Sequence, residues 1–386
     1  MKTIKSFFYL LTFLIVWPMI GYNYFLILLD KLIKLEDHPR KEQTPKVSLI
    51  IPAHNEEKVI LKKLENLMSL DYPNDKIEII VANDNSNDST ANIVESFINS
   101  NPKFKTRLYN VVERKGKTNA QNEAVKTTDC EILVFTDANS MLDQRAIQEL
   151  VSSFYDDSIM YVSGDLVYTN AADNPTSDAE NTYWNLDKKI RNIESNLSSI
   201  TAGNGALYAI RKDLYVEVPL IHSHDSKMPK EAVLRGYKAI TNNHAIAYEK
   251  AGENDEDEYK RKVRMNRVIF ESIFESLFFI NIFKYKFFTI QMLSHRTLRY
   301  LLAINHILLF IINTILVLKN PKLFYKLSLF LQTLFYVFAI IGRFNPFKLF
   351  KLPYYYCMTL VAQLHGMMNY FTGKRKPFWE KAESTR

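Results

Sequence analysis

Residues 47–57 read VSLIIPAHNEE, an apolar run that ends in a polar turn. The same pattern recurs downstream, and the further apolar runs lie at 77–81, 107–112 and 132–135. Amphipathic stretches separate the runs, at 56–70, 89–98, 118–127 and 145–154. This alternation predicts an α/β domain with a mostly parallel sheet covered by helices. Ligands of such sheets bind beyond the carboxyl ends of the strands, so the polar residues after each run form the candidate site.

An apolar stretch from Phe7 to Leu29 precedes this region. It is longer than the core of a signal peptide and no small-residue cleavage site follows it, so we expect a retained anchor rather than a cleaved signal. The linker after it, which ends at Pro45, carries the basic residues Lys31, Lys34, Arg40 and Lys41. Positive charge on this side predicts that the following domain faces the cytoplasm.

The C-terminal third contains several apolar segments. Residues 270–288 have apolar side chains at helical spacing with Glu271 and Glu275 between them, which predicts an amphipathic helix in the membrane interface. Three further segments have the length of membrane spans, at 300–318, 323–342 and 352–371. Three spans after a cytoplasmic domain would place the basic residues 374–376 outside, against the positive-inside rule. Either one segment does not cross, or the rule is broken here.

The predicted organisation therefore has three parts. We expect an N-terminal anchor with a basic linker at 1–45 and a cytoplasmic α/β domain at 46–268. An interfacial helix, about three transmembrane helices and a basic tail are expected at 269–386.

Composition excludes several classes of function. The formal charge of +7 and a pI near 9.0 are compatible with nucleic-acid binding, but the Lys and Arg residues cluster beside apolar segments. Anionic lipid headgroups explain that placement better, so we expect membrane lipids and no nucleic acid as partners. The two cysteines, Cys130 and Cys357, are too few for a disulfide framework or a thiolate metal site.

Two of the polar turns follow the first two runs. The first runs from Pro52 to Glu57, where Asn55 is either a functional residue or the cap of a helix that begins at Glu56. The second covers residues 83–90, and its Asp84 is well placed to accept hydrogen bonds from a base or a ribose. A plain turn in which Asp88 caps the next helix is the alternative.

The other two turns carry charge of opposite sign. Residues 113–117 place cations next to Gly116, which suits the oxygens of a diphosphate, although a solvated charge run has the same composition. Residues 136–140 follow a buried strand and contain Asp137 and Asn139. Their oxygens are ligands of the kind that Mg²⁺ takes together with substrate phosphates, and an Asx turn is the alternative.

In this order, the four turns resemble those of the family 2 glycosyltransferases, inverting enzymes of the GT-A fold, above all the membrane-bound group that includes the cellulose and hyaluronan synthases. The resemblance covers residues 47–267. It implies that a nucleotide-sugar contacts the residues that match the family's motifs, namely Pro52, Asn55, Glu56, Asp84, Ser86, Lys117, Asn122 and Asp137. It also implies a divalent cation, Mg²⁺ or Mn²⁺, at Asp137 and Asn139.

The resemblance extends to the acceptor side of the site. The small-residue segment that begins Gly203-Asn204-Gly205 matches the family's acceptor segment, and Asp225 falls where the family places its catalytic carboxylate. Arg261 and Arg264 align with the family's Gln-x-x-Arg-Trp motif, which implies an acceptor contact and a catalytic cation respectively. Asp187 and Glu194 are the competing carboxylates for the role of the base.

This chain departs from the family's pattern at several positions. Asn139 stands where the second metal-binding Asp is found, so one charge is missing from the cation site. Arg261 and Met265 replace the Gln and Trp of the Gln-x-x-Arg-Trp motif, which weakens the case for long-chain processivity. His224 precedes Asp225 where an acidic residue is common, and it is either a third metal ligand or a surface or capping histidine.

The function implied is inverting transfer of a sugar, from a nucleotide-diphosphate donor such as a UDP-sugar, to a lipid-linked or glycan acceptor at the cytoplasmic face of the cell membrane. A catalytically weak or inactive membrane subunit of a polysaccharide synthesis or export complex is the alternative, favoured by Asn83, Asn139 and Met265. A nucleotide-cofactor oxidoreductase is excluded because the turn from Pro52 to Glu56 is not a Gly-x-Gly-x-x-Gly turn. Polar residues within the apolar segments either line a glycan path or bond between helices, and they are Asn305, His306, Gln332 and His365.

Overall fold

The computed structural model describes residues 1–170, 175–252, 255–345 and 347–378. It divides into two compact units. We call one the sheet unit, which consists of residues 35–170, 187–251 and 376–386. The other is the helical unit, which consists of residues 1–34, 171–186 and 252–375.

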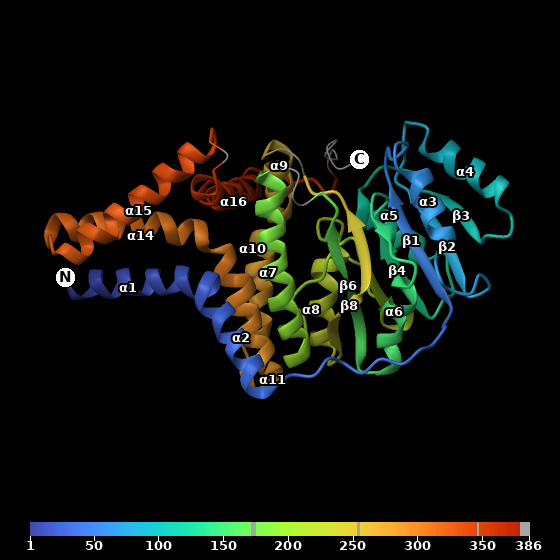
Figure 1. Cartoon of the computed structure of the whole chain (residues 1–386), viewed down its shortest axis with the longest axis horizontal. Coiled ribbons are helices and arrows are strands. Elements are labelled where there is room, and N and C mark those ends of the chain that lie inside the picture. The colour runs from blue at the N-terminus through green and yellow to red at the C-terminus, as the bar shows by residue number, and fades with distance from the viewer. Residues whose placement is uncertain (171–174, 253–254, 346, 379–386) are drawn as a thin grey trace. The chain divides into compact units, whose positions relative to one another are not determined.

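The sheet unit is built on one eight-stranded sheet with the order β3-β2-β1-β4-β7-β6-β8-β5 (Figure 1). Its strands are β1 (Val47–Ala53), β2 (Ile77–Asn83), β3 (Thr106–Asn110), β4 (Ile132–Thr136), β5 (Met141–Leu142), β6 (Ile159–Tyr168), β7 (Leu207–Arg211) and β8 (Lys238–Glu249). The four predicted runs are β1 to β4, and they pair in parallel. The sheet as a whole is mixed, because β7 is antiparallel to β4 and β6, and β5 is antiparallel to β8.

The direction of the chain decides which face each helix covers. The helices of this unit are α3 (Ile60–Met68), α4 (Thr90–Ser100), α5 (Lys117–Val125), α6 (Ala146–Ser152) and α8 (His224–Leu234), and α7 (Pro175–Leu197) belongs to it from residue 187 onward. The crossovers through α3 and α4 advance from β1 to β3, whereas the crossover through α5 returns to β4, so right-handed connections place α5 on the opposite face. There α5 and α8 enclose one core with Phe135 and Tyr208.

The first helix of the sheet unit begins later than predicted. The sequence predicts it from Glu56, but α3 starts at Ile60. Asn55 has a left-handed φ of 55°, and the Glu56 N–H donates to Thr90 Oγ1 at 2.7 Å. The segment before Ile60 is therefore a turn held by the neighbouring loop, and Asn55 does not cap a helix.

The helical unit contains no strand among the described residues. Its helices are α1 (Lys2–Val16), α2 (Tyr22–Ile33), α9 (Asp255–Met265), α10 (Ile269–Ser276), α11 (Ile282–Tyr285), α12 (Phe287–Gln291), α13 (Leu298–Tyr300), α14 (Leu302–Lys319), α15 (Leu323–Gly342) and α16 (Lys348–Phe371), with the short π-helical and 3-10 turns η1 (Trp17–Gly21), η4 (Asn266–Val268), η5 (Leu277–Phe279) and η6 (Met292–Thr297) between them. Within the described ranges, three helical segments are long and apolar enough to cross a membrane, namely 2–33, α14 and α15. The predicted anchor and two of the predicted C-terminal spans are thus confirmed as candidate spans.

The structure differs from two predictions for this unit. The third C-terminal span, expected at 352–371, lies in α16, which is not among the candidate spans of the described residues. Its polarity accounts for this, since Gln363, His365 and Asn369 interrupt the apolar residues. The single interfacial helix expected over 270–288 is instead broken into α10, α11 and α12, because the Asn281 side chain accepts from the Phe283 and Lys284 N–H groups and starts a new helix.

A buried ion cluster joins α9 to α16 within the helical unit. Glu258 is only 1% exposed, and both of its carboxylate oxygens accept from Arg261, at 2.6 and 2.9 Å. Lys262 Nζ lies 3.2 Å from the same carboxylate, and Tyr355 Oη of α16 donates to it at 2.9 Å. Burial alone would raise the pKa of Glu258, but the charges of Arg261 and Lys262 outweigh burial and lower this pKa to about 2.

We expect Glu258→Gln to destabilise the helical unit, because the amide leaves the buried Lys262 and the half-buried Arg261 without their carboxylate. Breaking a buried pair from one side costs about 3–5 kcal/mol. The stabilisation should be fully present above the unfolded carboxyl pKa of ~4.3 and be lost as the pH falls through about 2. Thermal unfolding in detergent, measured from pH 7 downward, tests both statements.

Glu256→Gln on the same helix is the matched control, because the Glu256 side chain is 76% exposed and pairs with Lys260 at the surface. Equal melting temperatures for the two variants would contradict the role of the buried cluster.

Candidate active site

The turns after β1 and β2 are bonded to each other by a reciprocal set of hydrogen bonds. The Asn55 N–H donates to Ser86 Oγ at 3.0 Å, and the Asn55 carbonyl Oδ1 accepts from the Asn87 N–H at 2.9 Å. Asn55 and Asn85 both have left-handed φ values, 55° and 54°. Pro52 lies at the end of β1 opposite Ala82, so the register of the strands places the two turns side by side.

Asp84 fixes the loop that holds Gly116. Its two carboxylate oxygens accept from the Lys115 N–H at 3.0 Å and from the Gly116 N–H at 2.8 Å. Gly116 has a φ of 98°, and a Cβ there would lie 2.8 Å from the Pro377 carbonyl oxygen, so only glycine fits. The acidic residue of one turn thus shapes the cationic loop of another.

The centre of the site is an ion pair between Lys117 and Asp137. Lys117 is the first residue of α5, and Asp137 follows β4 directly. Gly205 borders the pair, because a Cβ at Gly205 would lie 3.1 Å from Lys117 Nζ and 3.6 Å from Asp137 Oδ2. Three residues predicted from three separate motifs therefore lie together at the carboxyl ends of the strands.

The turn from Thr136 to Ser140 rests on a buried lysine. Lys63 of α3 has no solvent exposure, and its ammonium donates to Thr136 Oγ1 at 3.0 Å and to the Ser140 carbonyl oxygen. Burial lowers the pKa of Lys63 to about 7, although the charges of Asp137 and Glu249 act in the other direction. Lys63 was not predicted from the sequence. Its position among Ile60, Leu64 and Leu67 on the apolar face of α3 is the feature that indicates its burial.

Asn122 is a buried residue that holds the segment leading to Asp225. It is 1% exposed, its Nδ2 donates to the Val218 carbonyl oxygen at 2.8 Å, and its Oδ1 accepts from Tyr215 Oη at 2.7 Å. One turn earlier on α5, Thr118 Oγ1 donates to the His222 carbonyl oxygen at 2.6 Å. The Asn122 side chain is thus bonded to the protein's own segment before Asp225.

Asp225 lies in the first turn of α8 and is half-buried. Its backbone carbonyl accepts from the Gly203 N–H at 2.8 Å, which ties it to the predicted acceptor segment. His224 beside it is fully buried and stacks on the rings of Phe135 and Tyr215, with centroids 5.3 and 5.8 Å away. Burial lowers its pKa to about 3, so His224 is a neutral core residue and not the expected surface or capping histidine.

The acceptor segment has a fixed backbone. The Asn204 side chain donates to the Gly164 carbonyl at 2.6 Å and accepts from the Ala206 N–H at 3.1 Å. A Cβ at Gly203 would lie only 2.1 Å from Tyr161 Oη, which excludes any side chain at this position.

The other predicted residues occupy different surroundings. Asp187 pairs with Arg191 at 2.6 Å in a buried part of α7, and Glu194 is also fully buried. Arg261 is bonded to Glu258 in the helical unit, where Arg264 also lies on α9.

The donor set at the end of β4 fits a divalent cation only together with a substrate. Across the described ranges, no three His, Cys, Asp or Glu side chains gather as a metal cluster. Asp137 and Asn139 offer one carboxylate and one amide oxygen from a single turn. Mg²⁺ is commonly held by one or two carboxylates while phosphates and water complete its shell, so these residues fit a cation shared with a diphosphate.

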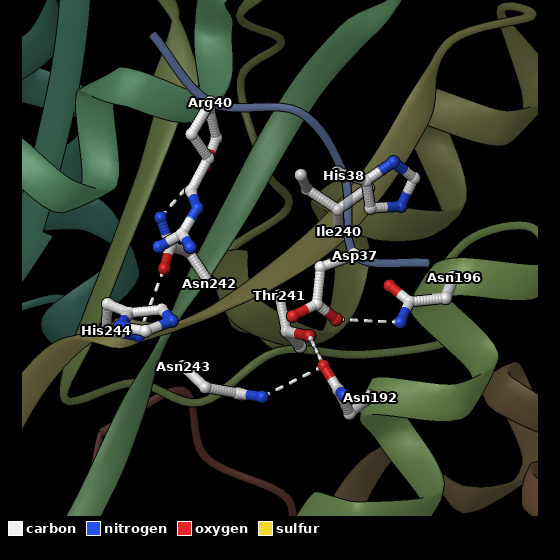
Figure 2. A pocket seen from close by; sticks show the side chains of 11 residues that line it. Asp37, His38, Arg40, Asn192, Asn196, Ile240, Thr241, Asn242, Asn243 and His244 are labelled. Atoms are coloured by element: carbon white, nitrogen blue, oxygen red, sulfur yellow. Dashed lines mark hydrogen bonds between the residues drawn. The ribbon is translucent and has the colours of Figure 1, made fainter. Parts of the chain in front are cut away.

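A small polar pocket lies away from this site, in the middle of β8 rather than at its carboxyl end (Figure 2). It is lined by Asp37, His38 and Arg40 of the linker, by Ser153 directly after α6, by Asn192 and Asn196 of α7, and by residues 240–244 of β8. Asn196 Nδ2 donates to Asp37 at 3.0 Å, and Asn192 Oδ1 accepts from Asn243 Nδ2 at 2.9 Å. The first bond joins the linker residue Asp37 to α7 and the second joins β8 to α7, contacts that the sequence pattern does not reveal.

Comparison with known proteins agrees with this arrangement. Residues 48–218 match the family model described as Glycosyl transferase family 2. The probable glycosyltransferase YdaM of Bacillus subtilis is 37% identical over 117 residues, 30% of this chain and 28% of that protein. The beta-monoglucosyldiacylglycerol synthase of Trichormus variabilis is 29% identical over 173 residues, 44% of this chain and 37% of that protein.

A poly-beta-1,6-N-acetyl-D-glucosamine synthase of Staphylococcus aureus is 24% identical over 204 residues, 53% of this chain and 48% of that protein. The matches thus span between 28% and 48% of these relatives' own lengths. Among solved structures, the mannosyltransferase PcManGT from Pyrobaculum calidifontis in complex with GDP-Man and Mn²⁺ has a TM-score of 0.73 at 19% identity, covering 96% of this chain and 99% of that one. This likeness confirms the predicted GT-A fold.

We expect Asn122→Ala to lower the stability of the sheet unit, because it removes the side-chain partner of the buried Val218 carbonyl oxygen and N–H. An unsatisfied buried polar group costs about 1–3 kcal/mol. The melting temperature should fall, while Asn99→Ala on the exposed side of α4 should leave it unchanged. A fully stable Asn122→Ala protein that binds nucleotide-sugars weakly would instead assign Asn122 to the donor.

Proposed function

We propose that this chain, whose residues 48–218 match the Glycosyl transferase family 2 model, transfers a sugar from a nucleotide-diphosphate donor, with inversion, to a lipid-linked or polysaccharide acceptor at the cytoplasmic face of the cell membrane. The observation that carries this proposal is the Lys117–Asp137 ion pair beside Gly205, at the carboxyl ends of β1, β2 and β4. A cation and an anion adjoin each other there, at the edge of the sheet where ligands of α/β folds bind.

Inversion needs a single displacement at the anomeric carbon. The acceptor hydroxyl is a poor nucleophile, so a carboxylate must accept its proton as the new bond forms. We assign this role to Asp225, which is half-buried in the first turn of α8 and tied to the acceptor segment through Gly203. Asp187 is a weaker candidate because it is engaged by Arg191 in a buried pair.

The leaving nucleoside diphosphate gathers negative charge as the bond breaks. Lys117 and the backbone of the Gly116 loop face the position where we place that diphosphate, and Arg264 is the further cation that we assign to it. Mg²⁺ or Mn²⁺, when bound, supplies charge neutralisation, and Asp137 and Asn139 are the residues that would hold it. Lys117 then exchanges its present partner Asp137 for the diphosphate.

We place the nucleotide between the first two turns. Each carboxylate oxygen of Asp84 accepts one hydrogen bond, from the Lys115 N–H or from the Gly116 N–H. The remaining lone pairs of the carboxylate can accept from a base or a ribose. Asn55, Glu56 and Ser86 complete the wall of this subsite. A UDP-sugar is the donor that the family resemblance favours, and GDP-sugars are the comparison to test.

A lipid-linked or polymeric acceptor agrees with a membrane location. Two relatives are named for such products, a glucosyldiacylglycerol and a poly-N-acetylglucosamine, although each matches this chain over less than half of its own length. Apolar side chains of the broken segment 270–288 are exposed, for example Phe278 at 66% and Phe283 at 93%, as expected of a surface that lies in the membrane interface.

We further propose that the chain crosses the membrane once before the sheet unit and twice after it. Pro377 and Phe378 belong to the sheet unit, where the Phe378 ring lies 4.9 Å from the Arg114 guanidinium. The tail and the sheet must then be on one side of the membrane, which requires an even number of crossings, and α14 and α15 supply two. This topology keeps Lys374 to Lys376 in the cytoplasm, in agreement with the positive-inside rule.

A catalytically weak or inactive subunit is the second candidate, favoured by the neutral Asn83 and Asn139. Asn83 is committed to structure, because its Nδ2 donates to Asn110 and its Oδ1 accepts from Ser86. Purified protein incubated with a panel of nucleotide-sugars and membrane lipids separates the two candidates. Release of nucleoside diphosphate supports the enzyme, and its absence from every mixture supports the subunit.

We expect Asp225→Asn to reduce kcat by ~10²–10⁴-fold while donor affinity stays close to that of the wild type, because the amide keeps the shape but cannot accept a proton. Radiolabelled sugar transfer and nucleotide-sugar titration measure the two quantities. Asp213→Asn, at an exposed position upstream, is the matched control. Near-normal turnover in Asp225→Asn would show that Asp225 has only a structural role in α8 and that another group is the general base.

We expect sugar transfer to require Mg²⁺ or Mn²⁺ and to be lost in Asp137→Ala, since the proposed cation site has only one carboxylate. Activity measured with and without chelator checks the requirement, and titration of Mn²⁺ in the presence of UDP checks the site. Full activity in the presence of chelator would remove the cation from the mechanism.

A further inference from the structure

Lys63 spans the turn that carries both proposed cation ligands. One partner of its ammonium, Thr136 Oγ1, directly precedes Asp137, and the other, the Ser140 carbonyl oxygen, directly follows Asn139. Both partners are fully buried, as is Lys63 itself. A single side chain from α3 therefore sets the distance between the two ends of the turn.

The same turn is held from the other side by β8. Ser140 Oγ donates to a carboxylate oxygen of Glu249, the last residue of that strand. Within the turn, the Ser140 N–H donates to the Asp137 carbonyl at 3.2 Å. The fully buried Lys63 and Ser140 and the half-buried Glu249 thus form a chain of polar groups that is bonded to the turn carrying Asp137 and Asn139.

Hydrogen bonding alone does not account for a lysine at this position. A neutral donor could satisfy a hydroxyl and a carbonyl, whereas a buried ammonium carries a desolvation cost of several kcal/mol unless anions offset it. Asp137 and Glu249 are the anions whose fields act on Lys63. The two hydrogen bonds of Lys63 Nζ, to Thr136 Oγ1 and to the Ser140 carbonyl oxygen, are the contacts through which Lys63 acts on the turn that carries Asp137.

We propose that Lys63 is a positioning residue for the cation site, an inference that rests on the proposed function: its ammonium fixes the Thr136–Ser140 turn so that Asp137 and Asn139 present their oxygens together to a divalent cation and the donor's diphosphate. Lys63 itself contacts neither substrate nor cation. It acts through the two ends of the turn.

The test compares Lys63→Met with Lys62→Met in the full-length protein in detergent. Methionine keeps the length and removes the charge, and Lys62 is the exposed neighbour on the same helix. Mn²⁺ binding is followed by electron paramagnetic resonance with UDP or GDP present, and transfer activity is measured against Mn²⁺ concentration. Changing a group that supports metal ligands typically lowers metal affinity about 10–100-fold, and we expect this loss for Lys63→Met alone.

The double variant Lys63→Met/Glu249→Gln removes the buried charge of Lys63 together with the half-buried charge of Glu249, and it covers the case in which Lys63→Met does not fold. Weak Mn²⁺ binding in the folded double variant supports positioning by the ammonium. Wild-type Mn²⁺ affinity in the double variant, or in a folded Lys63→Met protein, overturns it, because Lys63 would then only balance Glu249. A wild-type protein that binds no Mn²⁺ with either nucleotide would instead overturn the proposed cation site, and this inference with it.

Discussion

The parallel register of β1 is the constraint on which the site depends. β1 pairs with β2 on one side, with Ala53 opposite Asn83, and with β4 on the other, with Ile50 opposite Phe135. Because the three strands run in one direction, their carboxyl ends open at one edge of the sheet, and the polar turns after them must meet there. A slip by one residue would turn every side chain of β1 to the other face and shift the turn that follows β1 relative to the turns after β2 and β4.

The turns are then stiffened by bonds between them rather than by packing alone. Both carboxylate oxygens of Asp84 accept from the loop around Gly116. Asn55 donates to and accepts from the turn after β2. Lys63 donates to both ends of the turn that contains Asp137. Groups that are fixed before the substrate arrives need little reorganisation when charge develops on a leaving group. Polar residues that the sequence pattern also allows as solvated turns therefore hold the backbone of the candidate site in place.

The sequence was sufficient to predict β1 to β4, the helices between them and the four turns, because each is encoded by local periodicity and by short motifs. It was insufficient wherever partners come from distant segments. The late start of α3 depends on a bond between Glu56 and Thr90, and the antiparallel β7 joins β4 although some seventy residues separate them along the chain. Lys63 was not predicted as a site residue because a lysine in an amphipathic helix is usually exposed, and only its tertiary partners reveal its burial.

The charges around the end of β4 explain how a site with Asn139 in place of an acid can remain suited to a diphosphate. Lys117 brings one positive charge, Lys63 brings a second one below its lowered pKa of about 7, and Asp137 and Glu249 bring two negative charges. A second acid at position 139 would make the turn net negative and increase its dependence on a divalent cation before an anionic donor could approach. With the amide, the turn keeps an oxygen ligand without that repulsion, and Lys117 is available to transfer its charge from Asp137 to the donor. On the proposed function, the missing charge at Asn139 shifts part of the neutralisation of the leaving group from the cation to the protein's own lysine.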